Sequence, residues 1–269
     1  MSRTVEREVL HWRPDAQSTE AHQLVGEAPL IIRVGDETFS TGMRTPGEEE
    51  AHAAGFCLSL GVVTEPRHID SVRYCVEGET HCVRVGLTET GREQLARWRT
   101  WERPDRAETA GEAVDRLVRT AAPFSEREPV VIGRGIDALL GMRDIQPLRR
   151  ATRASHATAV FSREFKLMVV AEDVGRHNGL EKALGRLLLE KRLDRAGALV
   201  LSSRISFDLV QKAARARIPV IFSVSRPTAL AVRLAEALGM ALVCLAPDDH
   251  GFVFCGKERL DLNPAPAAD

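Results

Sequence analysis

The sequence predicts an α/β fold in which a smaller α+β N-terminal domain precedes a larger domain with a mainly parallel sheet. Two observations predict the larger domain. Between residues 166 and 245, short apolar runs alternate with segments whose apolar residues recur every three or four positions, as strands and helices do. Such strand–helix–strand repetition implies right-handed crossovers and a mainly parallel sheet that helices cover on both faces.

A change of pattern along the chain divides it into three segments. Residues 1–20 are polar, and we expect them to be loose. Residues 21–110 are predicted to form the N-terminal α+β domain, and residues 111–269 the α/β domain. The charged stretch 103–108 has no apolar periodicity and marks the region near the boundary between them.

Two hairpins are predicted in the N-terminal domain. The first spans residues 30–40, where two short strands flank a Gly-Asp turn signal. The second spans residues 72–85 and places Cys75 and Cys82 on facing strands. These two cysteines are therefore expected to be neighbours in a sheet.

One helix is predicted between the two hairpins. Thr45 is a suitable N-cap, Pro46 suits the first helical position, and Glu48 completes a capping box. Gly61 is a natural stop for this helix.

In the α/β domain, four strands and three helices are predicted. The strands are residues 166–171, 198–201, 220–224 and 241–245. The helices show apolar faces at Leu180, Leu184, Leu187 and Leu188, at Leu209, Val210, Ala213 and Ala214, and at Leu230, Leu234 and Leu238.

The charge and the hydropathy of the chain exclude several classes of function. Lys and Arg number 37 against 38 Asp and Glu, so no overall field would hold nucleic acid or an anionic membrane. No segment approaches the roughly 20 apolar residues that cross a bilayer. The first seven residues are charged, with no apolar run behind them, which is unlike a signal peptide. We expect a cytoplasmic protein whose thiols stay reduced.

None of the five cysteines has C-x-x-C spacing to another. Cys57 and Cys244 lie inside apolar stretches, where a free cysteine behaves as a small hydrophobic residue. A reactive thiol needs an accessible, electropositive setting, so both are predicted to be buried structural residues.

Polar loops follow the four predicted strands, at residues 172–177, 202–206, 225–228 and 247–250. If the strands are parallel, these loops meet at one edge of the sheet, where ligands of α/β proteins bind. Three of the loops contain an arginine and three lead into helices, a combination that favours phosphate. A pyrophosphate-containing ligand is one interpretation, and ordinary capped, solvated strand ends are the other.

Standard catalytic and nucleotide motifs are absent from the sequence. There is no P-loop and no G-x-G-x-x-G turn after a strand. A zinc deaminase would show H-x-E followed by P-C-x-x-C, but Ala157 and Thr158 follow His156, and the cysteine pair is missing. We therefore expect no zinc and no metal ligands, and His156 and His177 remain as the histidines of interest.

Several long motifs, taken in order, resemble those of the formate dehydrogenase accessory sulfurtransferase (FdhD/NarQ) family, over residues 28–260. The N-terminal signature is Thr45-Pro46-Gly47-Glu48-Glu49-Glu50, with Gly55-Phe56 and Leu60-Gly61. The further motifs are Ser155-His156-Ala157, Glu172-Asp173-Val174-Gly175-Arg176-His177-Asn178, Ser202-Ser203-Arg204-Ile205-Ser206-Phe207, Val210-Gln211-Lys212-Ala213-Ala214, Val224-Ser225-Arg226-Pro227-Thr228 and Leu230-Ala231-Val232.

The resemblance implies a cytidine-deaminase-like, three-layer C-terminal domain and a role in the maturation of formate dehydrogenase. It implies that the protein binds the molybdenum cofactor, Mo-bis(molybdopterin guanine dinucleotide), as cargo. The catalytic subunit of formate dehydrogenase, a cysteine desulfurase and a second copy of the chain are the implied partners.

The implied binding surface combines the strand-end loops with a stretch after the last parallel strand. Its predicted members are His156, Asp173, Arg176, His177, Ser203, Arg204, Leu245, Ala246, Pro247, Asp248, Asp249 and His250. His250 stands where the family commonly has an arginine, and the stretch is poorer in glycine and basic residues than is usual in the family.

The chain departs from the family at the cysteine pair that carries sulfur. That pair belongs between residues 119 and 136, where this chain reads Thr120-Ala121-Ala122-Pro123-Phe124-Ser125-Glu126-Arg127. A serine hydroxyl cannot carry a persulfide sulfur, so no catalytic residue is predicted. Three functions stay open: sulfur transfer through a displaced cysteine, a cofactor-delivering scaffold without it, and a paralogue that serves another molybdoenzyme.

Overall fold

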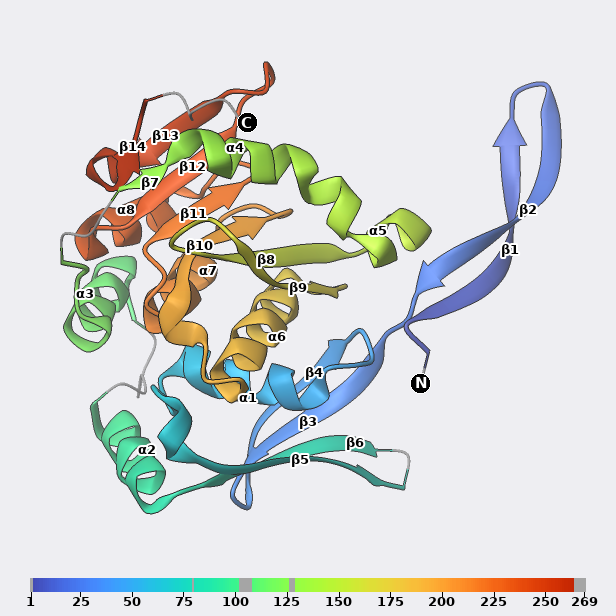
Figure 1. Cartoon of the computed structure of the whole chain (residues 1–269). Helices are drawn as coiled ribbons and strands as arrows, with labels where there is room; N and C mark the ends of the chain where they lie inside the picture. Colours follow the sequence, from blue (N-terminus) through green and yellow to red (C-terminus); the bar gives the residue numbers. More distant parts are fainter. Residues whose placement is uncertain (1, 79, 102–107, 126–128, 264–269) are drawn as a thin grey trace.

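The computed structural model describes residues 2–78, 80–101, 108–125 and 129–263 (Figure 1). The described strands form a two-stranded, a four-stranded and a six-stranded sheet, and a short pair. Most of the predicted boundary at residues 103–108 lies outside the described residues, so the division into two domains there stays a prediction. None of the described helices is long and apolar enough to cross a membrane.

The four-stranded sheet has the order β4-β3-β6-β5. Its strands are β3 (Ala28–Val34), β4 (Glu37–Arg44), β5 (Ile69–Glu77) and β6 (Thr80–Leu87). Both predicted hairpins are confirmed, and β3 and β6 pair in parallel. The apolar face of this sheet, with Leu30, Ile32 and Val83, belongs to a buried cluster that also contains residues of helix α1 (Glu49–Leu60).

The start of helix α1 differs from the prediction. Thr45 is not its N-cap, because the helix begins at Glu49 and Glu48 holds the cap position in a left-handed conformation without a side-chain cap. The Thr45 amide instead donates to Asp173, 128 residues along the chain. The predicted stop at Gly61 is correct, with φ at 87°.

The six-stranded sheet has the order β13-β12-β11-β10-β8-β9. Its strands are β8 (His156–Ser162), β9 (Leu167–Asp173), β10 (Ala196–Leu201), β11 (Val220–Ser223), β12 (Ala241–Leu245) and β13 (Gly251–Cys255). All four predicted strands are present, as β9 to β12. Within the described part of this sheet, β10–β11 and β11–β12 are parallel pairs, and the other three neighbouring pairs are antiparallel.

The prediction of a mainly parallel sheet is therefore wrong, and the sheet is mixed. Its physical cause is the length of two connections. Only residues 163–166 separate β8 from β9, and only residues 246–250 separate β12 from β13. A parallel crossover needs a dozen or more residues, so both connections can close only antiparallel pairs.

Helices cover both faces of the six-stranded sheet (Figure 1). Helix α4 (Ile132–Leu140) packs over the face that carries Val200, Phe222 and Val243. The opposite face packs against the helices α6 (Arg176–Leu189), α7 (Phe207–Arg215) and α8 (Ala229–Leu238). The remaining described helices are α2 (Glu89–Trp101), α3 (Ala110–Ala121) and α5 (Pro147–Thr152).

Residues 1–20 were expected to be loose, and the structure corrects this. Strands β1 (Thr4–Arg13) and β2 (Ala16–Val25) form a hairpin that projects from the rest of the molecule (Figure 1). Most of its side chains are exposed, so the sequence carries no alternating pattern that would reveal it. Backbone pairing from Thr4↔Val25 to Arg13↔Ala16 holds it instead.

Helices α1 and α6 pack at glycines. A Cβ on Gly55 would lie 1.8 Å from the Glu181 carbonyl oxygen, and a Cβ on Gly185 would lie 1.8 Å from the Ala51 carbonyl oxygen. Helix α1 belongs to the N-terminal segment and α6 to the C-terminal one. This close contact therefore packs the N-terminal segment, with its four-stranded sheet, against the helices that cover the six-stranded sheet.

We expect Gly185→Ala to lower the free energy of unfolding by about 3 kcal/mol, because the methyl group would force the two backbones apart. Gly141→Ala is the matched control, since nothing lies within 4 Å of a Cβ built there, and its effect should stay within about 1 kcal/mol. Urea unfolding followed by circular dichroism measures both. Equal stabilities of the two variants would contradict this account of the α1–α6 contact.

Candidate functional site

The carboxyl ends of β9, β10, β11 and β12 lie at one edge of the six-stranded sheet, as predicted, and the first residue of β8 joins them because His156 pairs with Asp173. The loops of this strand-end edge are in contact. The Ser223 hydroxyl donates to the Ser203 carbonyl, and the Cys244 thiol donates to the Ser225 carbonyl. These contacts join the ends of β10, β11 and β12.

Three arginines surround His156 at this edge. Burial lowers the pKa of His156, and the positive charges of Arg149, Arg176 and Arg204 lower it further. The imidazole is therefore uncharged at neutral pH. Among the described residues, Nδ1 of His156 and Nε of Arg176 are buried and have no hydrogen-bond partner. We call His156, Arg149, Arg176 and Arg204 the arginine cluster, and its positive charge suits an anion.

Ser203 and Arg204 have different roles in their loop. Ser203 is buried and donates through its hydroxyl to the Arg204 carbonyl, at 3.2 Å. The Arg204 side chain is exposed. Of the two predicted contact residues, Arg204 can meet a ligand, whereas Ser203 shapes the loop that carries it.

The predicted stretch Leu245–His250 makes the tight turn between β12 and β13. The Ala246 amide donates to the His250 carbonyl at 2.7 Å, and Asp249 adopts a left-handed conformation with φ at 61°. Residues 247–250 are exposed, whereas Ala246 is buried and Leu245 half-buried. His250 contacts the Asp248 carbonyl at 2.7 Å through Nδ1. The exposed side chains of this turn are thus Pro247, two aspartates and a histidine.

Arg226 lies beside this turn and was absent from the predicted contact residues. Its guanidinium is 4.1 Å from the centre of the Phe252 ring and 5.7 Å from that of Phe254. The sequence shows an arginine in this loop, but only the pairing of β13 with β12 brings the two aromatic rings to it. Arg149 was missed for a similar reason, since it lies on α5, outside the four loops.

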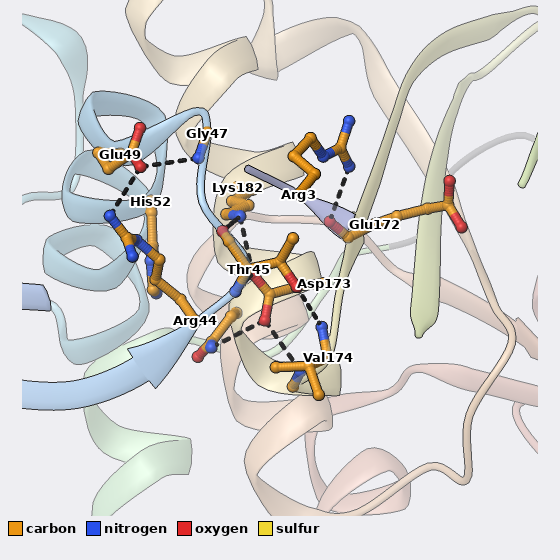
Figure 2. Close-up of polar contacts among 12 residues, drawn as sticks. Arg3, Arg44, Thr45, Gly47, Glu49, His52, Glu172, Asp173, Val174 and Lys182 are labelled. Atoms are coloured by element: carbon orange, nitrogen blue, oxygen red, sulfur yellow. Dashed lines mark hydrogen bonds and ion pairs between the residues drawn. The ribbon is translucent and has the colours of Figure 1, made fainter. Parts of the chain in front are cut away.

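Asp173 was predicted to contact the ligand, but its side chain is fully buried. Its Oδ2 accepts the Thr45 amide at 3.0 Å and pairs with the Lys182 ammonium at 2.7 Å (Figure 2). Its Oδ1 accepts the Gly175 amide and the Asn178 side-chain amide. These contacts leave Asp173 no exposed oxygen, so its place at the edge is structural.

The contact is reciprocal, because Thr45 also binds the loop that Asp173 begins. The Thr45 hydroxyl accepts the Val174 amide at 3.0 Å, and the Thr45 carbonyl accepts the Lys182 ammonium at 2.7 Å. The motifs at residues 45–50 and 172–178 therefore meet in space and hold each other.

Glu172 anchors the other side of the edge. Its buried carboxylate accepts the amides of Leu148 and Arg149, both at 2.8 Å, and the Ser155 hydroxyl at 3.1 Å. The amides belong to the first turn of α5, so Glu172 fixes the start of that helix. The position of Arg149 in the arginine cluster follows from this anchor.

His177 lies in a pocket apart from the arginine cluster. This pocket, of about 450 Å³, is lined by residues of β3, β4, α1, α2, α3, α6 and α7, among them Trp98, Arg116 and His177. Burial lowers the pKa of His177, as do the charges of Arg176 and Lys212. The structure therefore separates the two histidines of interest, since only His156 lies within the arginine cluster.

One wall of the pocket contains a buried charged group. Glu181 accepts from Lys212 at 2.7 Å and contacts Nε2 of His52 at 3.1 Å. Burial by itself would raise the pKa of Glu181, but Lys212 and His52 outweigh it and the pKa is lowered. The sequence signals for this group were the place of Lys212 opposite the apolar face of α7 and its place in the motif at residues 210–214.

Residues 120–125, which stand where the cysteine pair of the resembled family belongs, lie at the edge of the six-stranded sheet opposite the strand-end edge. The Phe124 amide donates to the Leu238 carbonyl, and the carbonyl groups of Ala121 and Ala122 accept from Arg217. Leu238 and Arg217 precede β12 and β11, so these contacts lie where the parallel strands begin. Glu126 and Arg127 lie outside the described residues.

Cys57 and Cys244 are buried, as predicted. Burial raises the pKa of each thiol to about 12, which makes both thiols unreactive. Within the described part of the chain, no three histidine, cysteine or acidic side chains are placed to hold a metal ion together.

Comparisons with known proteins agree on one family. A model described as the FdhD/NarQ family matches residues 25–261. A protein named sulfur carrier protein FdhD from Streptomyces coelicolor is 36% identical over 274 residues, which cover 97% of each chain. Its namesake from Mycolicibacterium paratuberculosis is 33% identical over 271 residues, covering 97% of this chain and all of that protein.

A solved structure has the same fold. It is described as a formate dehydrogenase accessory protein from Desulfotalea psychrophila, and it matches with a TM-score of 0.74 over 96% of this chain and 99% of its own. The sequence identity is 22%, so this likeness supports the fold alone.

We expect Lys182→Met to lower the free energy of unfolding by about 3–5 kcal/mol, because Asp173 would keep its charge in the interior without a counter-charge. Arg186→Met on the same helix is the control, since Arg186 is half-exposed and its ion pairs should contribute at most about 1 kcal/mol. Urea unfolding measures both variants. A loss of under 1 kcal/mol for Lys182→Met would contradict the anchoring role of this pair.

Proposed function

The chain belongs to the FdhD/NarQ family, and on this premise we propose that it is an accessory protein of formate dehydrogenase maturation. In this role it binds the guanine-dinucleotide molybdenum cofactor as cargo, at the strand-end edge. The same proposal includes a homodimer in the cytoplasm, formate dehydrogenase as its client and a cytidine-deaminase-like C-terminal domain.

The arginine cluster is the observation that carries this proposal. Guanidinium groups bind phosphate oxygens through paired, charge-assisted hydrogen bonds. The charges of Arg149, Arg176 and Arg204 all act on His156, so a pyrophosphate bound beside His156 would face three positive charges. The three arginines come from three separate segments, namely helix α5, the start of α6 and the loop after β10, which ordinary solvated strand ends would not require.

The helices beside the cluster favour the same ligand. Helix α6 begins directly at Arg176, and neither α6 nor α7 has a side-chain cap on its first amides. The amino end of a helix attracts anions through its free amides and its dipole. A phosphate held by Arg176 and Arg204 would lie between these two helix starts.

The guanine base has a suitable place farther along the edge. Asp248 and Asp249 are exposed on the 245–250 turn, and carboxylates accept hydrogen bonds from ring and amino N–H groups. Arg226 and Phe252 offer a flat surface next to this turn. In this arrangement the pyrophosphate binds the arginine cluster and the guanine base binds the turn. Asp173, Ser203 and His177 do not contact the ligand but hold the loops and the helix start that carry the arginines.

Sulfur carriage is the activity that the names of the curated relatives state. Residues 120–125 contain no cysteine, which favours a second candidate function. In that alternative the chain is a scaffold that delivers the cofactor, or a paralogue that serves another molybdoenzyme, and a desulfurase is not its partner. The cofactor-binding edge is common to both candidates.

We expect guanosine diphosphate to bind the purified protein, and Arg204→Ala to weaken that binding roughly 10- to 100-fold, the loss of one charge-assisted contact worth about 1.5–3 kcal/mol. Arg163→Ala is the control, because Arg163 is exposed and contacts Asp194 near the start of β10. Isothermal titration calorimetry measures all three proteins. No binding by folded wild type, or equal losses in both variants, would overturn the proposed site.

We also expect the pKa of His156 to rise when guanosine diphosphate binds. In the free protein the burial and the three arginines keep this pKa low, and a bound anion would offset the arginine charges and favour the imidazolium. Histidine resonances followed by NMR across pH, with His156→Gln for assignment, give the two values. An unchanged or lowered pKa would place the nucleotide elsewhere.

A further inference from the structure

We propose that Cys75 and Cys82 form a redox-active pair in which Cys75 accepts sulfur as a persulfide and Cys82 resolves it. The inference rests on the proposed function, because it supplies the sulfur-carrying step of a chain whose residues 120–125 lack cysteine. It assigns that step to the four-stranded sheet rather than to a segment between residues 119 and 136.

The two cysteines lie directly opposite each other in the antiparallel pair β5–β6. Their Cα atoms are 5.2 Å apart and their sulfurs are joined in a disulfide. The ladder continues on both sides, through Tyr74↔Val83 and Val76↔His81. Backbone hydrogen bonds therefore keep the two residues at bonding distance whether the thiols are oxidised or reduced.

The two positions differ in accessibility, which assigns their roles. Strand β5 is the edge of its sheet, and Cys75 is partly exposed on it. Strand β6 lies between β3 and β5, and Cys82 is fully buried. An incoming persulfide can reach Cys75 alone. Cys82 can then attack only Cys75, its partner across the ladder. Cys75 is therefore the thiol that takes up sulfur, and Cys82 is the resolving thiol.

Positive side chains adjoin the pair. Arg73 and Arg84 face each other one step along the same face of the sheet, and Arg33 continues this row on β3, because residues two apart in a strand share a face. Nearby guanidinium groups favour the thiolate, which is the reactive form. The other three cysteines differ, because burial raises the pKa of the Cys57, Cys244 and Cys255 thiols to about 12, 12 and 11, and at Cys244 it outweighs the charge of Arg226.

The pair lies at the end of the sheet nearest the proposed ligand edge. Ile31 of β3 pairs with Cys82 on one side and with Thr41 on the other. Thr41 precedes Thr45 by four residues, about 13 Å along a strand, and Thr45 binds Asp173 at the strand-end edge. The segment 120–125, in contrast, lies at the other edge of the six-stranded sheet.

The chemistry balances with a protein or small-molecule persulfide as donor. The Cys75 thiolate attacks the outer sulfur of the donor, the donor's S–S bond breaks and the donor leaves as a thiolate. The resulting Cys75 persulfide either passes its outer sulfur to an acceptor, or is attacked at its inner sulfur by Cys82. That attack releases hydrosulfide and forms the Cys75–Cys82 disulfide, which a dithiol reductant then returns to two thiols.

The test uses the reduced full-length protein and glutathione persulfide as donor. Cys82→Ser should trap about one cyanide-releasable sulfur per chain, whereas Cys75→Ser should hold none beyond background. Wild type should release hydrosulfide and regain the disulfide. Cys255→Ser should behave as wild type, since Cys255 is also partly exposed but has no paired cysteine. Cold cyanolysis, a sulfide assay and intact mass measure these outcomes.

Equal sulfur loading of Cys75→Ser and Cys82→Ser, or no hydrosulfide release from wild type, would overturn the proposal. Both variants lose the same disulfide, so a difference in sulfur loading between them cannot come from the loss of that bond. Guanosine diphosphate binding by the two variants tests the strand-end edge separately. Retained nucleotide binding without sulfur loading would reject the cysteine pair alone, and the reverse result would reject the ligand edge alone.

Discussion

The buried ion pair between Asp173 and Lys182 binds Thr45 and thereby fixes the position of the N-terminal segment relative to the six-stranded sheet. Neither side chain is appreciably exposed, and removing two charges from water costs several kcal/mol each unless other polar contacts offset it. Both oxygens of Asp173 are occupied, and the Thr45 backbone gives one hydrogen bond to Asp173 and accepts one from Lys182. The pair favours this one docking of the four-stranded sheet, because any other docking would remove the hydrogen bonds that the Thr45 backbone makes with both buried charges.

Two adjacent carboxylates at the end of β9 perform two anchoring tasks because strand side chains alternate between faces. Glu172 binds the first turn of α5 and thereby places Arg149, whereas Asp173 binds Thr45 on the opposite side. The loop that follows turns Arg176 toward His156 and leaves His177 in the pocket. The arginines of the edge are thus held in position by Glu172 and Asp173, two carboxylates that are buried and hydrogen-bonded.

The proposed binding surface and the proposed sulfur carrier belong to different parts of the fold. The edge depends on loops of the six-stranded sheet, and the cysteine pair depends on the ladder of the four-stranded one. Thr45 joins the two, since it ends the β4 connection and binds the loop after β9. The proposed binding edge does not depend on residues 120–125, because the contacts of Ala121, Ala122 and Phe124 with Arg217 and Leu238 lie at the opposite edge of the six-stranded sheet.

The sequence by itself determined the four strands β9 to β12, both N-terminal hairpins, the buried Cys57 and Cys244, and the meeting of the strand-end loops, because apolar periodicity and turn residues are local signals. Tertiary structure decided what local signals do not encode. The insertion of β8 made the sheet mixed, the pairing of β1 with β2 ordered a polar segment, and the docking of Thr45 turned Asp173 from a predicted ligand contact into a buried anchor. In each case the partner lies on another strand or up to 128 residues away along the chain. Only the folded chain therefore specifies which polar groups are hydrogen-bonded and which are left to bind a ligand.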